Sequence, residues 1–441
     1  MQETTIFDGL ITGAKEVMGK LSDKRMASNA TKYTMESAGM GALSIFMMQD
    51  PSFLSHQTRL ARGTSTHNFR SLFSCEDIPT PNQIRNLLDG VEASELESLY
   101  HNGLEALEKH GGLQKFKYLQ NSYLIALDGT GFHSSDTIHC CNCTVKIRKD
   151  KSSNDKTEYS HSMLAAAIVS PEEKEAIALV PEFITPQDGH DKQDCENAAI
   201  KRWLVKHSKN YSHLNPTILG DDLLSRQPIC EAIIKEKYHF ILTCKPDSHT
   251  TLYEYMERIT INKAKFNVKK KNGKKYIYQY KYMAQLPLRD SEDALLVNWF
   301  EITEIEEKTG KSIYKNSFIT DHDINQENIQ QLALAARSRW RIENENNNTL
   351  KTKGYHFEHN YGHGKNNLSM IFASLAVVAF LYHTVMNIVD LIYIKAKEVQ
   401  GTRINFFNVI KAIAANLVFK SWNNLMLFLT APPDPFSIGE F

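Results

Sequence analysis

Two short apolar runs that each lead directly into aspartate constrain the fold of this chain more than any other feature. Residues 122–128, SYLIALD, end in Asp128 and are followed by Gly-Thr-Gly, and residues 216–220 lead into Asp221 and Asp222. Runs of this length and composition predict buried strands. A carboxylate at the end of such a strand lies at an edge of the sheet, where a metal ion can compensate its charge. The ordinary alternative for each aspartate is a turn residue after a strand.

The segments around these runs predict an α/β fold. Further strands are expected at residues 162–169, 176–181 and 238–245, and helices at residues 195–204 and 225–235. The first strands are closely spaced, which suits an antiparallel meander. The later alternation of strand and helix predicts a sheet covered by helices.

Changes in composition divide the 441 residues into five parts. They are residues 1–115, helical and expected to bind DNA; 116–245, the first part of the core; 246–321, a β-rich insertion; 322–400, the remainder of the core; and 401–441, a C-terminal helix and tail. Basic residues in the first part would contact phosphate rather than read bases. An ordinary solvated helical domain is the alternative for that part.

Residues 336–351, ARSRWRIENENNNTLK, lack proline and glycine and predict a helix. On it Arg339 and Glu343 are four residues apart and share a face. A surface helix with a simple ion pair would show the same spacing. Together with Asp128 and Asp221, however, Glu343 completes a set of two aspartates at strand ends and a glutamate on a later helix. Such a set can hold two divalent ions about 4 Å apart, and its hard oxygen ligands favour Mg²⁺ or Mn²⁺.

Overall charge gives no indication of a nucleic-acid partner, because Lys plus Arg and Asp plus Glu both number 51. A DNA-binding surface therefore requires local clustering. The insertion provides it, with many lysines and tyrosines around a predicted hairpin turn between Lys270 and Lys274. These side chains suit phosphate contacts and base stacking. Lysines that protect a sheet edge from aggregation are the alternative.

The sequence HCCNC places His139, Cys140 and Cys143 close together, six residues and more after His133. With one of these histidines, the Cys-x-x-Cys pair would supply three or four zinc ligands. No second cysteine pair lies nearby in the sequence, so reduced cysteines in a hairpin are an equal alternative. Seven cysteines, an odd number, do not form the pattern of a secreted disulfide framework.

Three motifs together resemble those of IS4-like DDE transposases, over residues 120–385. LDGTG contains the first aspartate, ILGDDL the second and RWRIE the glutamate. The family motif around the glutamate is Tyr, two residues, Arg, three residues, Glu, six residues and Lys. Here the Tyr position is Ala336, and the lysine falls one place late, at Lys351, because Leu350 occupies its position.

The resemblance implies an RNase H-like catalytic core with an inserted β-rich module and a helical N-terminal domain. It implies that Asp128, Asp221 and Glu343 bind two Mg²⁺ or Mn²⁺ ions and catalyse DNA cleavage at terminal inverted repeats, followed by joining to target DNA within a homodimeric synaptic complex. Arg339 and Lys351 would hold backbone phosphate. Trp299 or Tyr278, in the insertion, would stack on a flipped base. Whether Asp222 replaces Asp221, or Glu345 replaces Glu343, stays open.

Two alternatives remain beside a transposase: an RNase H-like nuclease that cuts without joining, and a catalytically silent DNA-binding relic. For location, we expect a cytoplasmic bacterial protein, because the N-terminus lacks the basic start and apolar run of a secretory signal. Residues 368–386 are apolar enough to suggest a membrane span. A buried helix of a large globular domain is the preferred interpretation.

Overall fold

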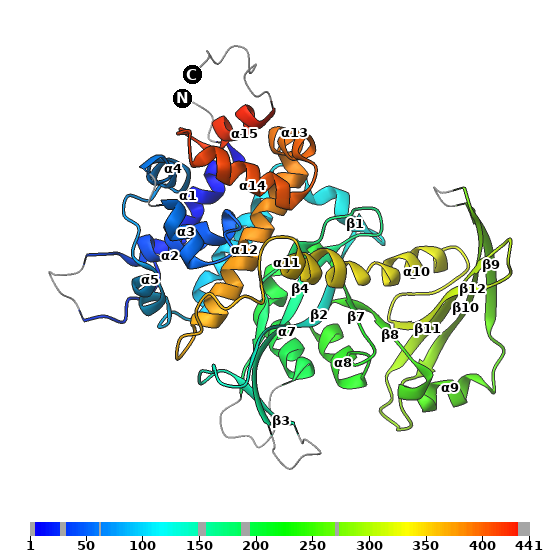
Figure 1. The fold of residues 1–441 in the computed structure, drawn as a ribbon. Coiled ribbons are helices and arrows are strands. Elements are labelled where there is room, and N and C mark those ends of the chain that lie inside the picture. The colour runs from blue at the N-terminus through cyan, green and yellow to red at the C-terminus, as the bar shows by residue number, and fades with distance from the viewer. Residues whose placement is uncertain are drawn as a thin grey trace.

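A twelve-stranded mixed sheet and a body of helices beside it make up the fold (Figure 1). This computed structural model describes residues 5–26, 32–60, 63–148, 156–186, 195–269 and 273–430. The predicted α/β class is confirmed.

The strands are β1 (Lys117–Tyr118), β2 (Ser122–Ser135), β3 (Thr144–Arg148), β4 (Lys156–Val169), β5 (Ile177–Ala178), β6 (Glu182–Ile184), β7 (Pro216–Gly220), β8 (His239–Thr243), β9 (Asn262–Lys269), β10 (Lys275–Pro287), β11 (Leu296–Glu306) and β12 (Ser312–Thr320). The helices are α1 (Ile6–Gly19), α2 (Met35–Met47), α3 (Phe53–Leu60), α4 (Gly63–Phe73), α5 (Pro81–Leu88), α6 (Glu97–Lys109), α7 (Glu196–Tyr211), α8 (Gln227–Lys235), α9 (Thr250–Met256), α10 (Ile329–Arg337), α11 (Asn348–Thr352), α12 (Leu368–Val389), α13 (Leu391–Gln400), α14 (Arg403–Ala414) and α15 (Trp422–Thr430).

The sheet combines an antiparallel meander with a parallel centre. Its order is β3-β4-β2-β7-β8-β12-β11-β10-β9, with β1 paired to β2 and with β5 and β6 paired to β4. Strands β2, β7 and β8 run parallel, whereas β4 pairs antiparallel with β2. Parallel strands are buried on both faces, which explains why SYLIALD and PTILG are continuous apolar runs.

Strand β2 is longer than the sequence predicts. The prediction that Asp128 ends its strand is wrong, because β2 continues to Ser135 and Asp128 pairs with Ala165 of β4. On the other side of β2, however, the parallel neighbour β7 stops at Gly220. Asp128 therefore lies on β2 just beyond the last residue of its neighbour β7. The carboxylate stays partly exposed at this edge of the sheet.

The predicted β-rich insertion extends the same sheet and is not a separate β module. Its last strand, β12, pairs antiparallel with β8 of the core, with Ile319 opposite Leu242. Helix α10 then returns from this extension towards the centre of the molecule (Figure 1). An ion pair of 2.8 Å between Arg337 Nη1 and Glu304 Oε2 fixes α10 to β11. The extension thus anchors the start of the segment that carries Glu343.

Helices from both ends of the chain pack together, although the sequence divided them into separate parts. Asn68 Nδ2 on α4 donates to the carbonyls of Ala414 and Leu417, at 2.7 Å each. Trp422 Nε1 on α15 donates to the Leu72 carbonyl at 2.8 Å. The C-terminal helices therefore belong to the same body as α1–α6.

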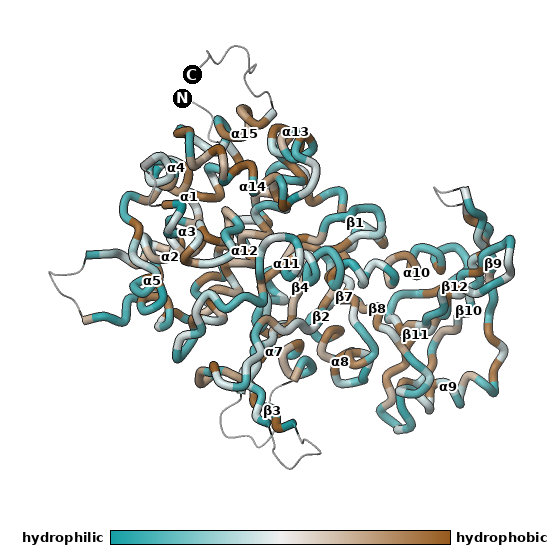
Figure 2. The backbone as a smooth tube through the Cα atoms, viewed as in Figure 1, coloured by the Kyte–Doolittle hydropathy of each residue, from teal (hydrophilic) through white to brown (hydrophobic). Residues whose placement is uncertain are grey.

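Helix α12 lies at the centre of this helical body, in contact with α2, α5, α6 and α13. Among the described residues it is the one helix long and apolar enough to cross a membrane, and its apolar window is wholly buried inside the protein. In Figure 2, hydrophobic residues gather around α12, whereas hydrophilic residues predominate along β9. The predicted buried core helix is confirmed.

Helices α6 and α12 approach closely because Gly103 faces Leu381. A Cβ at Gly103 would lie 2.7 Å from Leu381 Cδ2, and Leu381 is fully buried. We expect Gly103→Ala to destabilise the protein by about 1–3 kcal/mol, since an overpacked core must shift. The matched control is Gly9→Ala on α1, where an added Cβ meets no described atom within 4 Å. Helix propensity alone should make it neutral or stabilising by about 1 kcal/mol. Thermal unfolding of both variants measures the difference, and equal midpoints would contradict the close packing.

Candidate active site

Asp128 lies at the centre of a cluster of carboxylates on the sheet. Its side chain is 21 % exposed, and its Oδ1 lies 3.8 Å from Arg339 Nη1. Asn347 Nδ2 donates to the other oxygen, Oδ2, at 2.9 Å. These two contacts connect β2 to the helical segment that follows α10. They also hold the carboxylate in one orientation.

The parallel register of β2 and β7 brings Asp221 to the level of Asp128. Ala126 pairs with Leu219, so two residues further along each strand the register reaches Asp128 and Asp221. Asp221 Oδ1 accepts a hydrogen bond of 3.0 Å from the Leu223 amide, two residues along the chain. Within the described part of the chain, this is the one hydrogen bond of this oxygen. Its negative charge acts on Asp128 and raises the pKa of that carboxyl.

Asp222 points to a different part of the fold. Its Oδ1 accepts hydrogen bonds of 2.7 Å from the Lys245 amide and from Ser248 Oγ, in the segment between β8 and α9. Asp222 therefore fixes this segment. The geometry favours Asp221 as the residue that faces Asp128.

Glu343 lies on a π-helix, Ile342–Asn347, and not on the long regular helix that the sequence predicts. Its Oε1 lies 2.6 Å from Arg339 Nη2, so one guanidinium contacts both Glu343 and Asp128. The charge of Glu345 acts instead on Arg341, where it opposes the lowering of the guanidinium pKa by burial. Arg341 Nη2 donates to the Pro171 carbonyl at 3.1 Å. π-Helical turns occur frequently at functional sites. Here the turn directs Glu343 towards Asp128, and Glu345 away from it.

A fourth carboxylate, Glu196, was missed by the sequence analysis. It is the first residue of α7. A Cβ at Gly129 would collide with the Glu196 carboxylate, so this side chain lies directly against the backbone next to Asp128. Burial and the charge of Asp221 raise the pKa of Glu196. Glu196 heads a helix whose place relative to β2 depends on contacts between distant segments, and its spacing in the sequence gave no indication of this.

The cluster carries more negative charge than the described residues around it compensate. Burial, above all, raises the pKa of Asp128 to about 6; the charge of Glu343 adds to this, Arg339 opposes it, and Glu196 and Asp221 raise it further. Arg339 Nη1 is itself buried without a hydrogen-bond partner in the described part of the chain. Carboxylate oxygens are the ligands that Mg²⁺ and Mn²⁺ prefer. No three of these four carboxylates have ligand atoms that all lie within 4.8 Å of one another, so an ion would have to draw them together.

The residues predicted to hold DNA phosphate are paired with carboxylates here. Arg339 lies between Asp128 and Glu343, and Lys351 Nζ lies 2.8 Å from Glu358 Oε1. Lys274 Nζ lies 3.2 Å from Glu306 Oε1, and Lys270 lies outside the described residues. Contact of these cations with phosphate stays a prediction.

The aromatic residues predicted to stack on a flipped base are core residues in this structure. Trp299 is 1 % exposed, and its Nε1 donates to Tyr253 Oη at 3.2 Å. Tyr278 is 6 % exposed and packs near Arg337. The prediction that they present a stacking surface is wrong. The two rings lie on opposite faces of the sheet, and each face is covered: Tyr253 of α9 contacts Trp299, and Arg337 of α10 lies near Tyr278.

The predicted cysteine cluster forms, but with different histidines. Cys140 and Cys143 converge with His161 and His363. His139 points away: its Nδ1 faces the Thr137 carbonyl and its ring stacks on Tyr159. The prediction that His139 belongs to this group is wrong. His133 is near, with its ring centre 4.2 Å from that of His363, but its Nε2 faces the Ile138 carbonyl.

The raised pKa of Asp128 predicts a pH-dependent cost in stability. An unfolded aspartate has a pKa of about 3.9, against about 6 in the folded protein. As pH rises between these values, the unfolded chain releases the proton while the folded protein retains it, so the free energy of unfolding falls. Asp128→Asn removes this cost. In chelator, we expect it to stabilise the protein by about 1–3 kcal/mol at pH 8, with the gain fading towards pH 4.

Thermal unfolding across this pH range measures the effect, and Asp136→Asn, at an exposed position, is the control. A gain from Asp128→Asn that is the same at pH 4 and pH 8 would contradict the electrostatic origin.

Comparison of the chain with models of known protein families finds no match, and comparison with curated proteins finds none either. The function is therefore inferred from the chemistry of this site and from the motifs in the sequence.

Proposed function

We propose that this chain is a metal-dependent DNA transposase of the IS4-like DDE group, built on an RNase H-like core. One observation carries the proposal: Asp128, Asp221 and Glu343 come from three separate segments of the chain, and the charges of the other two both act on Asp128. These are the three residues of the motifs that resemble this group. In a structural ion pair, each carboxylate has a cation beside it. Here four carboxylates share the single guanidinium of Arg339, and such an excess of charge is typical of a functional site.

The topology supports the proposed core. An antiparallel meander of β2, β4, β5 and β6 joins the parallel strands β7 and β8 through β2. Ligand sites of open α/β sheets lie beyond the carboxyl ends of such parallel strands. Asp221 follows the carboxyl end of β7, and the Asp128 side chain lies beside it in register.

The protein residues have distinct tasks in this proposal. Asp128, Asp221 and Glu343 would hold the divalent ions, which supply activation of the attacking oxygen and stabilisation of the leaving oxygen when bound. Asn347 orients Asp128 through its amide hydrogen bond. Arg339 keeps Asp128 and Glu343 close in the absence of ions, and its guanidinium can turn to a phosphate oxygen when they bind.

A surface cleft borders Glu196, one of the four carboxylates of this cluster. It is lined by Thr144, Ser162, Ile184, Cys195, Glu196, Asn197 and Leu223, from β3, β4, β6, α7 and the turn after Asp221. Double-stranded DNA bearing the terminal inverted repeats, and then target DNA, are the proposed partners, with a second copy of the chain in the synaptic complex.

The decisive test is Mg²⁺-dependent cleavage of labelled DNA that carries the ends of the element encoding the chain. We expect Asp128→Asn, Asp221→Asn and Glu343→Gln each to reduce the cleavage rate by about 1,000-fold, because each removes a metal ligand worth several kcal/mol in the transition state. The matched controls are Asp222→Asn and Glu345→Gln, which should remain within about tenfold of the native rate.

Each outcome of this test has a definite meaning. Joining of cleaved ends to a second DNA distinguishes the transposase from a nuclease that only cuts. Tight binding of the ends with no cleavage by the native chain would favour a DNA-binding relic. Loss of activity in the two controls, with retention in Asp221→Asn or Glu343→Gln, would overturn the residue assignment.

Glu196 should matter for the affinity of the ions without being indispensable. Glu196→Gln removes one charge from the cluster, and we expect the Mg²⁺ concentration for half-maximal cleavage to rise by about 10-fold or more. Gly129→Ala should have a similar effect, because the new Cβ occupies the space of the Glu196 carboxylate. Titration of Mg²⁺ at fixed DNA measures both variants. An unchanged titration curve for both would show that Glu196 only fills space beside Gly129.

A further inference from the structure

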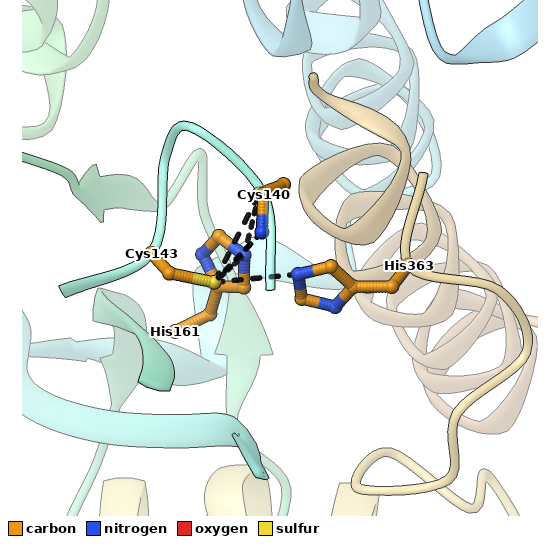
Figure 3. Close-up of side chains that lie close together, drawn as sticks. All are labelled: Cys140, Cys143, His161 and His363. Atoms are coloured by element: carbon orange, nitrogen blue, oxygen red, sulfur yellow. Dashed lines mark hydrogen bonds between the residues drawn. The ribbon is translucent and has the colours of Figure 1, made fainter. Parts of the chain in front are cut away.

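Four metal-ligating side chains converge at a second position, away from the carboxylate cluster (Figure 3). Cys140 and Cys143 lie in the turn between β2 and β3, His161 on β4, and His363 in the segment that leads to α12. Cys143, His161 and His363 are 3 %, 1 % and 6 % exposed. Solvent therefore contributes little to the solvation of these polar groups.

Four of the six distances among the ligand atoms match the edges of a tetrahedral site, and all six are within 4.8 Å. Cys143 Sγ lies 3.3 Å from His161 Nε2 and 3.3 Å from His363 Nε2. Cys140 Sγ lies 3.3 Å from His161 Nε2 and 3.9 Å from Cys143 Sγ. With Zn–S of about 2.3 Å and Zn–N of about 2.0–2.1 Å, a tetrahedron has S···S edges of about 3.8 Å and S···N edges of about 3.5 Å. Each observed distance is within about 0.2 Å of these edges.

Reduced cysteines alone do not account for this group. A sulfur separation of 3.9 Å excludes a disulfide, and both cysteines are free. A thiol is a weak hydrogen-bond partner for an imidazole. Burial of these polar groups is costly unless a stronger ligand satisfies them. One metal ion between the four atoms would do so.

The ligand types select the metal. Two thiolates and two imidazoles in tetrahedral geometry suit zinc, whereas the hard cations that fit the carboxylate cluster prefer oxygen ligands. All four positions are supplied by protein side chains, which leaves none for a substrate or a reactive water. Closed sites of this kind are structural.

We propose that Cys140, Cys143, His161 and His363 bind one structural zinc ion. The ion joins the β2–β3 turn and β4 to the segment before α12, and so fastens the sheet to the helical body. This assignment does not depend on the proposed transposase activity.

Hydrogen bonds already dock these two parts in the required position. The Cys141 amide donates to the Lys365 carbonyl at 3.3 Å, and Asn142 Nδ2 donates to Asn367 Oδ1 at 2.9 Å. Gly362 and Gly364, on either side of His363, have φ of +143° and +70°. A residue with a side chain rarely adopts these angles. The two glycines therefore let His363 turn into the site.

Metal analysis of the purified full chain tests the proposal. We expect about one zinc per chain after purification without chelator, and less than about 0.1 in Cys143→Ser and in His363→Gln. The matched controls are Cys141→Ser and His139→Gln, whose side chains adjoin the group in sequence but do not belong to it. Both should keep the full zinc content. His239→Gln is a third control, because His239, Asp321 and His322 form another group of converging ligand atoms in the described part of the chain.

Substitution with Co²⁺ gives a measurement that does not require a folded variant. Bound to the native chain, Co²⁺ in this site should show the intense visible bands of tetrahedral coordination and a thiolate-to-metal charge-transfer band. Zinc should displace it at one equivalent. A native chain that neither contains zinc nor gives these bands would overturn the proposal. Zinc that persists in both Cys143→Ser and His363→Gln, or that is lost only in His239→Gln, would overturn it as well.

Discussion

The parallel pairing of β2 with β7 is the interaction on which the proposed site depends. Parallel strands bring their carboxyl ends to one edge of a sheet, and their register fixes which residues meet there. Ala126 opposite Leu219 leaves Asp128 level with Asp221. A slip of one residue would turn one of these side chains to the other face of the sheet. The apolar residues before both aspartates, which are buried on both faces, oppose such a slip. Packing of the core therefore determines where the two charges lie.

The site imposes a cost that the surrounding residues only partly offset. Burial and nearby carboxylates raise the pKa of Asp128, so its ionised form destabilises the folded chain at neutral pH. Arg339 and the Asn347 amide are the compensating contacts on the π-helical side. A residue chosen for stability alone would be uncharged at this half-buried position on β2. Such departures from the local rules of folding are expected at functional sites, where a bound cation offsets the cost.

Local patterns, together with the resemblance of three motifs to a known family, singled out Asp128, Asp221 and Glu343, whose catalytic role stays a prediction. Asp128 and Asp221 follow apolar runs, and Glu343 lies four residues from an arginine on a helical stretch, so each is visible within its own segment. Glu196 and His161 were not identified from the sequence, because each reaches its cluster only through the packing of one segment against others. The same limit applies to the β-rich insertion: the pairing of β12 with β8 spans more than seventy residues, and no periodicity in the sequence indicates such a pairing.

The β2–β4 ladder connects the two clusters, because Asp128 lies on β2 and His161 on β4. Asp128 pairs with Ala165 across the β2–β4 ladder, and His133 pairs with His161 a few positions along, beyond a register shift. Over this outer stretch β2 has lost its neighbour β7, since β7 ends at Gly220. A strand that extends past its neighbour is stabilised by fewer hydrogen bonds and bends more easily. A zinc ion bound through His161 and His363 would brace this overhang against the helical body. The zinc site would then keep β2, the strand that carries Asp128, in place while the divalent ions at the carboxylate cluster exchange.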